Sequence, residues 1–132
     1  MPEGHSRLYW FSHFLQLTLS PRDECLMWVI EHGIWPSSEN WHLFGRLRQS
    51  YGETRTLDEA PGHLFTSDEA ADVTTFVEVS ISCGWGFYLL TSGPRQAFLS
   101  HDEYVDFVVE SEDASGALIA ELKESRVRIL RP

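Results

Sequence analysis

Hydrophobic residues recur three and four positions apart along much of the chain, the spacing of a helix that buries one face. This spacing predicts a helix over residues 8–19, which we expect to unravel near Leu17, where alternating leucines favour a strand. A second helix is predicted over residues 21–33. Ser20 provides its N-cap and Pro21 its first-turn proline.

A third helix is predicted over residues 41–51, with an N-cap at Ser37 or Ser38 and an end at Gly52. Together with the helix before it, this segment would form a helical hairpin. Residues 53–66 show no sustained period and contain an Ala-Pro-Gly break, so we interpret them as an ordered connecting loop.

The middle of the chain predicts one more helix followed by a hairpin. Thr66 and Glu69 have the spacing of a capping box, which predicts a helix from this point to Cys83. Residues 86–91 and 96–99 then form two apolar runs separated by Ser-Gly-Pro-Arg, a pattern typical of a β-hairpin.

The last third is interpreted as two helices and a short strand. Ser100 and Glu103 repeat the capping-box spacing and predict a helix over residues 101–110. Another helix is predicted over 117–125, and an alternating edge strand over 126–129. We therefore predict a single α+β domain over all 132 residues. Its helical hairpin and further helices would pack on a small, roughly three-stranded, mainly antiparallel sheet.

The distribution of charge limits the kinds of partner that the protein is expected to bind. The formal net charge is -10, and thirteen of the acidic residues lie between Arg55 and Lys123, where Arg95 is the only basic residue. Such a surface repels phosphate backbones and anionic lipid, so we expect no direct nucleic-acid binding and no membrane binding. The same field accelerates association with a basic protein.

The hydrophobic content indicates a folded chain, and the positions of the two cysteines indicate a reducing environment. Hydrophobic residues make up 42% of it, which argues against disorder. Cys25 and Cys83 lie in apolar segments, so we interpret them as buried, reduced thiols. Neither a secretory signal nor a run of eighteen apolar residues is visible. A cytoplasmic location is therefore expected.

No catalytic or cofactor motif is evident. The six histidines include no pair at metal-ligand spacing, and no glycine-rich phosphate loop is present, so we predict no metal and no cofactor. His101, beside Asp102, is a candidate for acid–base chemistry, although capping explains its neighbours. Glu121 and Lys123 have the nuclease-like spacing of two, but on a predicted helix they would diverge. We therefore assign no catalytic residue.

Three stretches resemble those of small bacterial proteins of unknown function. They are Trp35 to Trp41, Glu59 to His63 and Ser100 to Glu103, within roughly residues 20–107. The resemblance implies no activity, and no functional residue is transferred from it.

The leading hypothesis is a non-enzymatic protein-binding or regulatory module that docks a basic partner, as nuclease inhibitors or nucleic-acid mimics do. The expected contact residues are Asp102, Asp106, Glu110, Glu112 and Asp113. The alternative is a small enzyme that uses His63 or His101 as general acid or base, in a pocket between the 53–66 loop and the hairpin. A homo-oligomer held by exposed aromatic residues is a third possibility.

Overall fold

The computed structural model describes residues 4–19, 24–31, 41–99, 104–125 and 127–130. In chain order its elements are α1 (His5–Leu19), β1 (Glu24–Glu31), α2 (Trp41–Ser50), β2 (Gly62–Thr66), the 3₁₀ turn η2 (Ser67–Glu69), α3 (Asp72–Ser82), β3 (Gly86–Thr91), β4 (Arg95–Leu99), β5 (Val105–Val109) and α4 (Glu112–Glu124).

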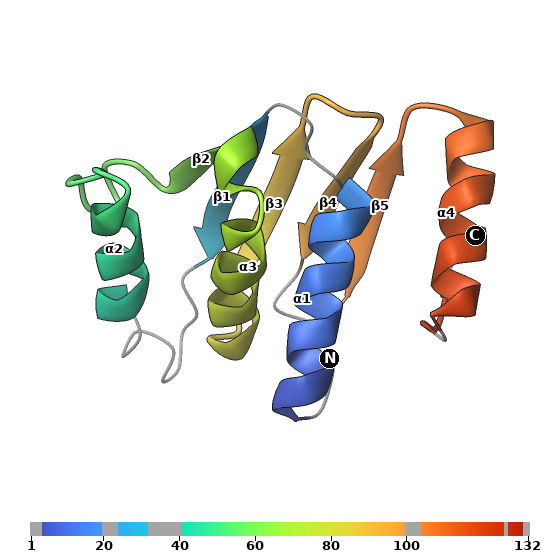
Figure 1. Cartoon of the computed structure of the whole chain (residues 1–132), viewed down its shortest axis with the longest axis horizontal. Helices are drawn as coiled ribbons and strands as arrows, with labels where there is room; N and C mark the ends of the chain where they lie inside the picture. Colours follow the sequence, from blue (N-terminus) through green and yellow to red (C-terminus); the bar gives the residue numbers. More distant parts are fainter. Residues whose placement is uncertain (1–3, 20–23, 32–40, 100–103, 126, 131–132) are drawn as a thin grey trace.

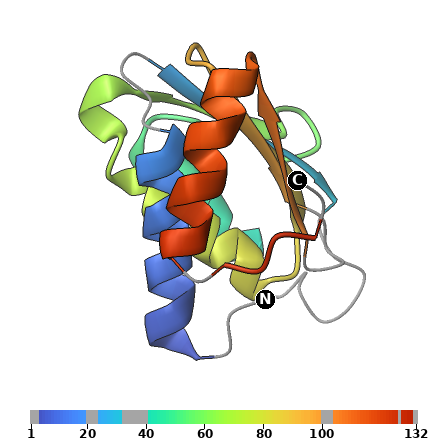
Figure 2. The same ribbon diagram turned by 90° about the vertical axis from the view of Figure 1, so that its right-hand side faces the viewer.

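The strands form one antiparallel sheet in the order β2-β1-β3-β4-β5. The four described α-helices lie on one side of this sheet, with α1 beside α3 and α4 near the β5 edge (Figures 1 and 2). The α+β class is confirmed. The sheet has five strands where about three were predicted. Two segments that we interpreted as helices and one that we interpreted as a loop contain strands, whereas residues 127–129 of the predicted edge strand do not form one.

The first of these segments is β1. A helix over residues 21–33 was wrong, and with it the helical hairpin, because Glu24–Glu31 pairs with β2 on one side and β3 on the other. Cys25, Met27 and Val29 are buried against the helices, while the residues between them point the other way. Because both faces of β1 carry apolar residues, its sequence lacks the alternation of apolar and polar positions that indicates a strand. The Ser20–Pro21 signal lies outside the described residues.

The second is β5. A helix over 101–110 was wrong for Val105–Val109, which pairs with β4 from Val105↔Leu99 to Arg95↔Val109. Val105 and Phe107 pack against the core as alternate residues of a strand. Three β-branched valines in five residues favour this conformation. Residues 127–129 are not a strand, so the predicted edge strand over 126–129 was also wrong there.

The other elements largely follow the prediction. Helix α1 continues to Leu19 without unravelling, and α2 and the β3–β4 hairpin lie where expected. The Glu69 carboxylate accepts hydrogen bonds from the backbone amide and hydroxyl of Thr66, and η2 then leads into α3. Helix α4 begins five residues earlier than predicted, where the Ser111 hydroxyl oxygen accepts a bond from the Ala114 amide. Within the predicted 53–66 loop, residues 62–66 form β2.

The core lies between the helices and the inner face of the sheet. Phe76 of α3 is fully buried and contacts Phe44 of α2 edge-to-face, with ring centroids 5.2 Å apart. Cys25 and Cys83 are buried thiols, as predicted. Burial raises the pKa of Cys25 to about 12, so its thiol stays protonated at neutral pH.

Candidate functional site

The face of the sheet opposite the helices is a broad apolar surface. The strand register places Trp28, Tyr88 and Phe98 side by side on β1, β3 and β4, and Asp106 follows on β5. No described helix covers this side (Figure 2). Because successive side chains of a strand alternate, the same sequence fills the core on one face and leaves apolar residues outside on the other.

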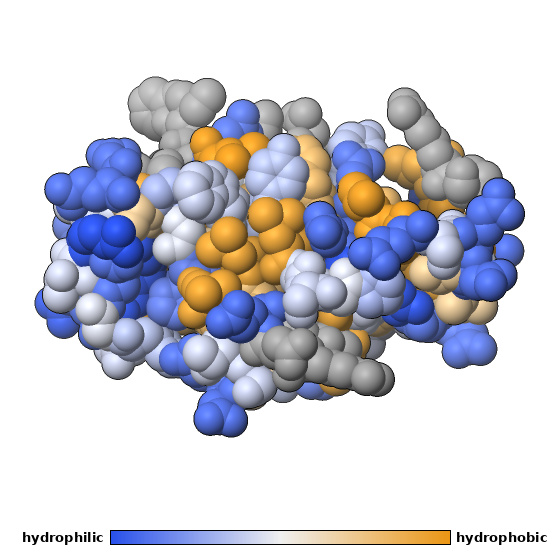
Figure 3. All heavy atoms as spheres, turned by 90° about the horizontal axis from the view of Figure 1, so that it is seen from above, coloured by the Kyte–Doolittle hydropathy of each residue, from blue (hydrophilic) through white to orange (hydrophobic). Residues whose placement is uncertain are grey.

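These outer residues are substantially exposed. Trp28 is 42% exposed, Tyr88 38% and Leu64 51%. The rings of Tyr88 and Phe98 stack with centroids 4.7 Å apart. Figure 3 views the molecule from above, with the open side of the sheet edge-on, and hydrophobic side chains reach the surface in its middle between hydrophilic flanks. Apolar patches of several hundred Å² often mark an interaction site. We call the outward-facing residues of the five strands the open face; its apolar members are Leu26, Trp28, Ile30, Leu64, Tyr88, Leu90, Phe98 and Val108.

Carboxylates border the open face at its β5 end. Asp106 lies on the outward side of β5, and Glu110 follows the strand four residues later. Glu112 and Asp113 are exposed in the first turn of α4, where the helix dipole favours negative charge. We call these four residues the acidic rim. Asp102, the fifth residue of the predicted contact surface, lies outside the described residues.

The basic residue of β4 that pairs with the end of β5 points away from the rim. Arg95 of β4 forms two hydrogen bonds to the Glu121 carboxylate of α4, at 2.8 and 2.9 Å, on the helical side of the sheet. Within the described part of the chain, no arginine or lysine forms an ion pair with a rim carboxylate.

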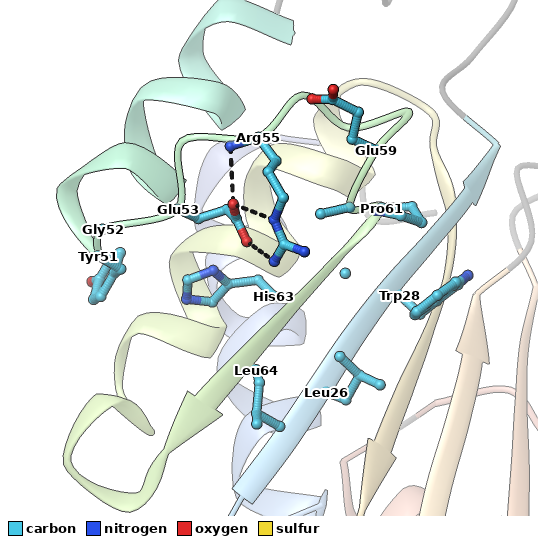
Figure 4. A pocket seen from close by; sticks show the side chains of 12 residues that line it. Leu26, Trp28, Tyr51, Gly52, Glu53, Arg55, Glu59, Pro61, His63 and Leu64 are labelled. Carbon is cyan, nitrogen blue, oxygen red and sulfur yellow. Dashed lines mark hydrogen bonds and ion pairs between the residues drawn. The ribbon is translucent and has the colours of Figure 1, made fainter.

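At the opposite end of the open face, beside β2, lies a hollow of about 520 Å³. Its floor is formed by apolar side chains of β1 and β2, and its wall by the loop before β2 (Figure 4). The volume falls within the range of roughly 300–1,000 Å³ that is typical of ligand pockets. The lining residues are Leu26, Trp28, Tyr51, Gly52, Glu53, Arg55, Glu59, Ala60, Pro61, Gly62, His63 and Leu64.

An ion pair organises the wall of the hollow. The Glu53 carboxylate accepts hydrogen bonds from the Arg55 backbone amide and from its Nε, both at 2.9 Å, and from its Nη2. These bonds to Arg55 hold the pKa of Glu53 at about 2. The buried Arg48 guanidinium lies 3.8 Å from the same carboxylate. Arg48 is buried although it carries a charge, with only 1% of its surface exposed.

His63, one of the two histidines of the enzyme hypothesis, lines this hollow. Its ring packs against Phe76, Phe65 and Tyr51, with centroid distances of 5.0, 4.5 and 5.2 Å. Glu53 also lines the hollow, but no hydrogen bond between described residues joins it to His63, so it does not orient the imidazole as a catalytic acid–base pair requires. His101 lies outside the described residues.

Stability should depend on pH through His63. Burial lowers the pKa of His63 below its usual 6.5, so the unfolded chain binds this proton more readily than the folded protein. The free energy of unfolding therefore has its full value above pH 6.5. It decreases as the pH falls from 6.5 toward the lower pKa of His63 in the folded state. The slope that one proton contributes is at most about 1.4 kcal/mol per pH unit.

The measurement is urea unfolding between pH 7.5 and 5. His63→Phe, which preserves an aromatic ring at this position, should flatten the profile. His42→Gln, at an exposed position of α2, is the matched control and should leave it unchanged. Identical profiles for the wild type and His63→Phe would show that His63 is not the group responsible.

Other kinds of site are not evident in the described residues. No group of three or more histidine, cysteine, aspartate or glutamate side chains in those ranges is placed to hold a metal ion. None of the helices in the described segments has the length and apolar character needed to cross a bilayer.

Sequence reasoning named Asp106, Glu110, Glu112 and Asp113 but missed the apolar residues that adjoin them. Leu26, Trp28 and Ile30 had been assigned to a helix, so their shared direction on a strand was not recognised. Comparison of the chain with protein families, with curated proteins and with solved structures finds no match.

Proposed function

We propose that this protein is a binding module that docks a basic protein on its open face. The observation that supports this most directly is the continuity between the exposed apolar strip and the acidic rim. Trp28, Tyr88 and Phe98 form a row that ends at Asp106. An apolar centre bordered by charged residues is the usual arrangement of a protein–protein interface, and Trp and Tyr are frequent hot-spot residues.

The size of the open face suits such a role. Its five most exposed apolar side chains, including Trp28 and Tyr88, are each between 38% and 63% exposed. Their exposed area is on the order of 500 Å², more than half of the roughly 800 Å² that each partner buries in a standard interface. The apolar strip would therefore supply most of the affinity.

Charge favours a basic partner over a second copy of the chain. With a net charge of -10, two copies docked face to face would bring their acidic rims together at an energetic cost. The outward residues of the described strands include carboxylates at positions 24 and 106 but no arginine or lysine, and Glu110 follows β5 directly. A partner with apolar side chains between arginines would meet complementary charge at the rim.

The test uses a synthetic peptide with one apolar stripe of leucines and one stripe of arginines. Its control has glutamate in place of each arginine. In the protein, Asp106→Arg with Glu110→Arg reverses two rim charges. The matched control, Asp68→Arg with Glu124→Arg, makes the same change in net charge at exposed positions away from the open face.

We expect the rim variant to slow association with the basic peptide about tenfold at low salt and to flatten its salt dependence. The matched control should slow it much less. Separately, Tyr88→Ala should accelerate dissociation, since it removes apolar contact area. Equal effects of the two charge-reversal pairs would reject the rim as the docking site, and tight self-association of the wild type would favour the homo-oligomer.

A further inference from the structure

The hollow beside β2 has two planar groups on opposite sides. The Trp28 ring and the Arg55 guanidinium both line it, and Figure 4 shows them separated, with Pro61 at the edge between them. Trp28 comes from the sheet and Arg55 from the loop that rises beside it. An aromatic ring placed between them would contact an indole on one side and a guanidinium on the other.

Arg55 is fixed in place before any ligand arrives. Its Nε and Nη2 both donate to the Glu53 carboxylate, which itself lies near the buried Arg48. The side chain of Arg55 is nevertheless 64% exposed, so this ion pair orients the guanidinium without covering it. A guanidinium held rigidly by a carboxylate is well suited to stack on an aromatic ring, since little side-chain freedom is lost on binding.

Gly62 lets Leu26 and Trp28 pack close against the backbone of β2 at the floor of the hollow. A Cβ at this position would lie 3.0 Å from Leu26 Cδ1, 3.1 Å from Trp28 Cε3 and 3.3 Å from the Met27 carbonyl oxygen. Its φ angle is not in the left-handed region, so the backbone conformation itself does not require glycine. The absence of a side chain is instead required by the close approach of Leu26 and Trp28.

The charges of the hollow favour an uncharged ligand. Glu53 is paired with Arg55, and the Glu59 carboxylate accepts bonds from the amide and hydroxyl of Thr56 at 2.9 and 3.0 Å. The guanidinium groups of Arg55 and of the nearby buried Arg48 thus balance the carboxylates of Glu53 and Glu59. Leu26, Leu64 and Pro61 add apolar contacts.

We propose that this hollow is a binding site for a neutral planar aromatic ring, stacked between Trp28 and Arg55. The ring can belong to a small molecule or to an aromatic side chain of a docked protein. The site does not depend on the proposed function, because a free ring would bind to it without any protein partner.

The experiment titrates the protein with N-acetyl-tryptophanamide and follows backbone amide and indole N–H signals by NMR. N-acetyl-leucinamide, which is apolar but not planar, is the control ligand. We expect a dissociation constant on the order of 1 mM for the aromatic probe, consistent with the affinity that a ligand of this size can reach. The leucine probe should bind at least about fivefold more weakly, and the shifts should centre on Trp28, Gly62 and Leu64.

Three variants test the stacking geometry. Arg55→Lys keeps the charge but loses the plane, and should weaken the aromatic probe about threefold or more. Arg46→Lys, at an exposed position of α2, is the matched control and should have no effect. Gly62→Ala should also weaken binding, because it displaces Leu26 and Trp28; the Arg55→Lys result stands even where Gly62→Ala impairs folding.

Peptide arms distinguish the two sources of the ring. The Arg-Leu peptide described above is compared with a version in which one leucine is replaced by tryptophan. A tenfold gain that Arg55→Lys abolishes assigns the ring to a protein partner, whereas binding of the free probe alone assigns it to a small molecule. Equal binding of the two amides, or shifts away from the hollow, would overturn the proposal while leaving the rim experiment unaffected.

Discussion

Arg48→Ala is expected to lower the free energy of unfolding by about 3 kcal/mol or more, the scale for breaking one side of a buried charged contact. The guanidinium is 1% exposed and donates through Nη2 to the Ala60 and Gly62 carbonyl oxygens, at 2.5 and 3.4 Å. It also lies 3.8 Å from Glu53. Removal would leave a buried carbonyl of Ala60 without this donor and would detach α2 from the loop beside β2.

The comparison of variants separates hydrogen bonding from packing. Arg48→Met keeps most of the aliphatic volume, so we expect it to recover part of the loss but not the contribution of the bonds to Ala60. Arg46→Ala, on the exposed side of the same helix, should change stability by less than about 0.5 kcal/mol. Urea unfolding monitored by fluorescence measures all three. A loss below about 1 kcal/mol for Arg48→Ala would contradict a structural role for this residue.

The variant should also affect the hollow, because Arg48 connects α2 to the chain that forms its wall. Arg48 lies near Glu53, which orients Arg55. Where Arg48→Ala remains folded, we expect broader amide signals for residues 53–61 and weaker binding of the aromatic probe. A buried arginine thus links the stability of this end of the molecule to the geometry of its candidate ligand site.

The burial of Arg48 could not be predicted from the sequence. Charged residues of a helix usually face solvent, but Arg48 is buried because it donates to carbonyl groups of the chain before β2. The sequence alone does not show that this segment lies beside α2. The same limit explains β1. Cys25 and Val29 are spaced as well for a helix as for a strand, and pairing with β2 and β3 on both sides selects the strand.

Two elements with local signals were predicted correctly. Thr66 with Glu69 and the Ser-Gly-Pro-Arg turn after Thr91 specify a cap and a hairpin within a few residues, and both are present. Asp106 faces outward on β5 even though the predicted helix was wrong, and Glu110 follows the end of that strand. The open face could not be predicted, because it appears only when β1 is a central strand.

Phe76→Ala is expected to lower the free energy of unfolding by about 4 kcal/mol, within the range for removing a buried phenylalanine ring. Phe76 is 0% exposed and contacts four other rings. Its centroid lies 5.2 Å from Phe44, 5.9 Å from Tyr51, 5.0 Å from His63 and 4.8 Å from Phe65. Truncation to alanine removes the ring contacts with Phe44 of α2, with Tyr51 just after α2, and with two rings of β2. A ring of this size leaves a cavity that the neighbouring side chains fill only in part.

The size of the cavity can be separated from the loss of the ring. Phe76→Leu retains much of the volume and should cost about half as much, whereas Thr75→Ala, at an exposed position of α3, should be nearly neutral. Thermal unfolding should show a decrease of roughly 15 °C for Phe76→Ala. A decrease in the unfolding temperature no greater than that of Thr75→Ala would show that the aromatic cluster around Phe76 contributes little to stability. His63 and Tyr51 line the hollow and both pack against Phe76, so Phe76→Ala should also weaken binding at the candidate ligand site. The acidic rim lies at the other end of the sheet, so its charge and its effect on association should not change.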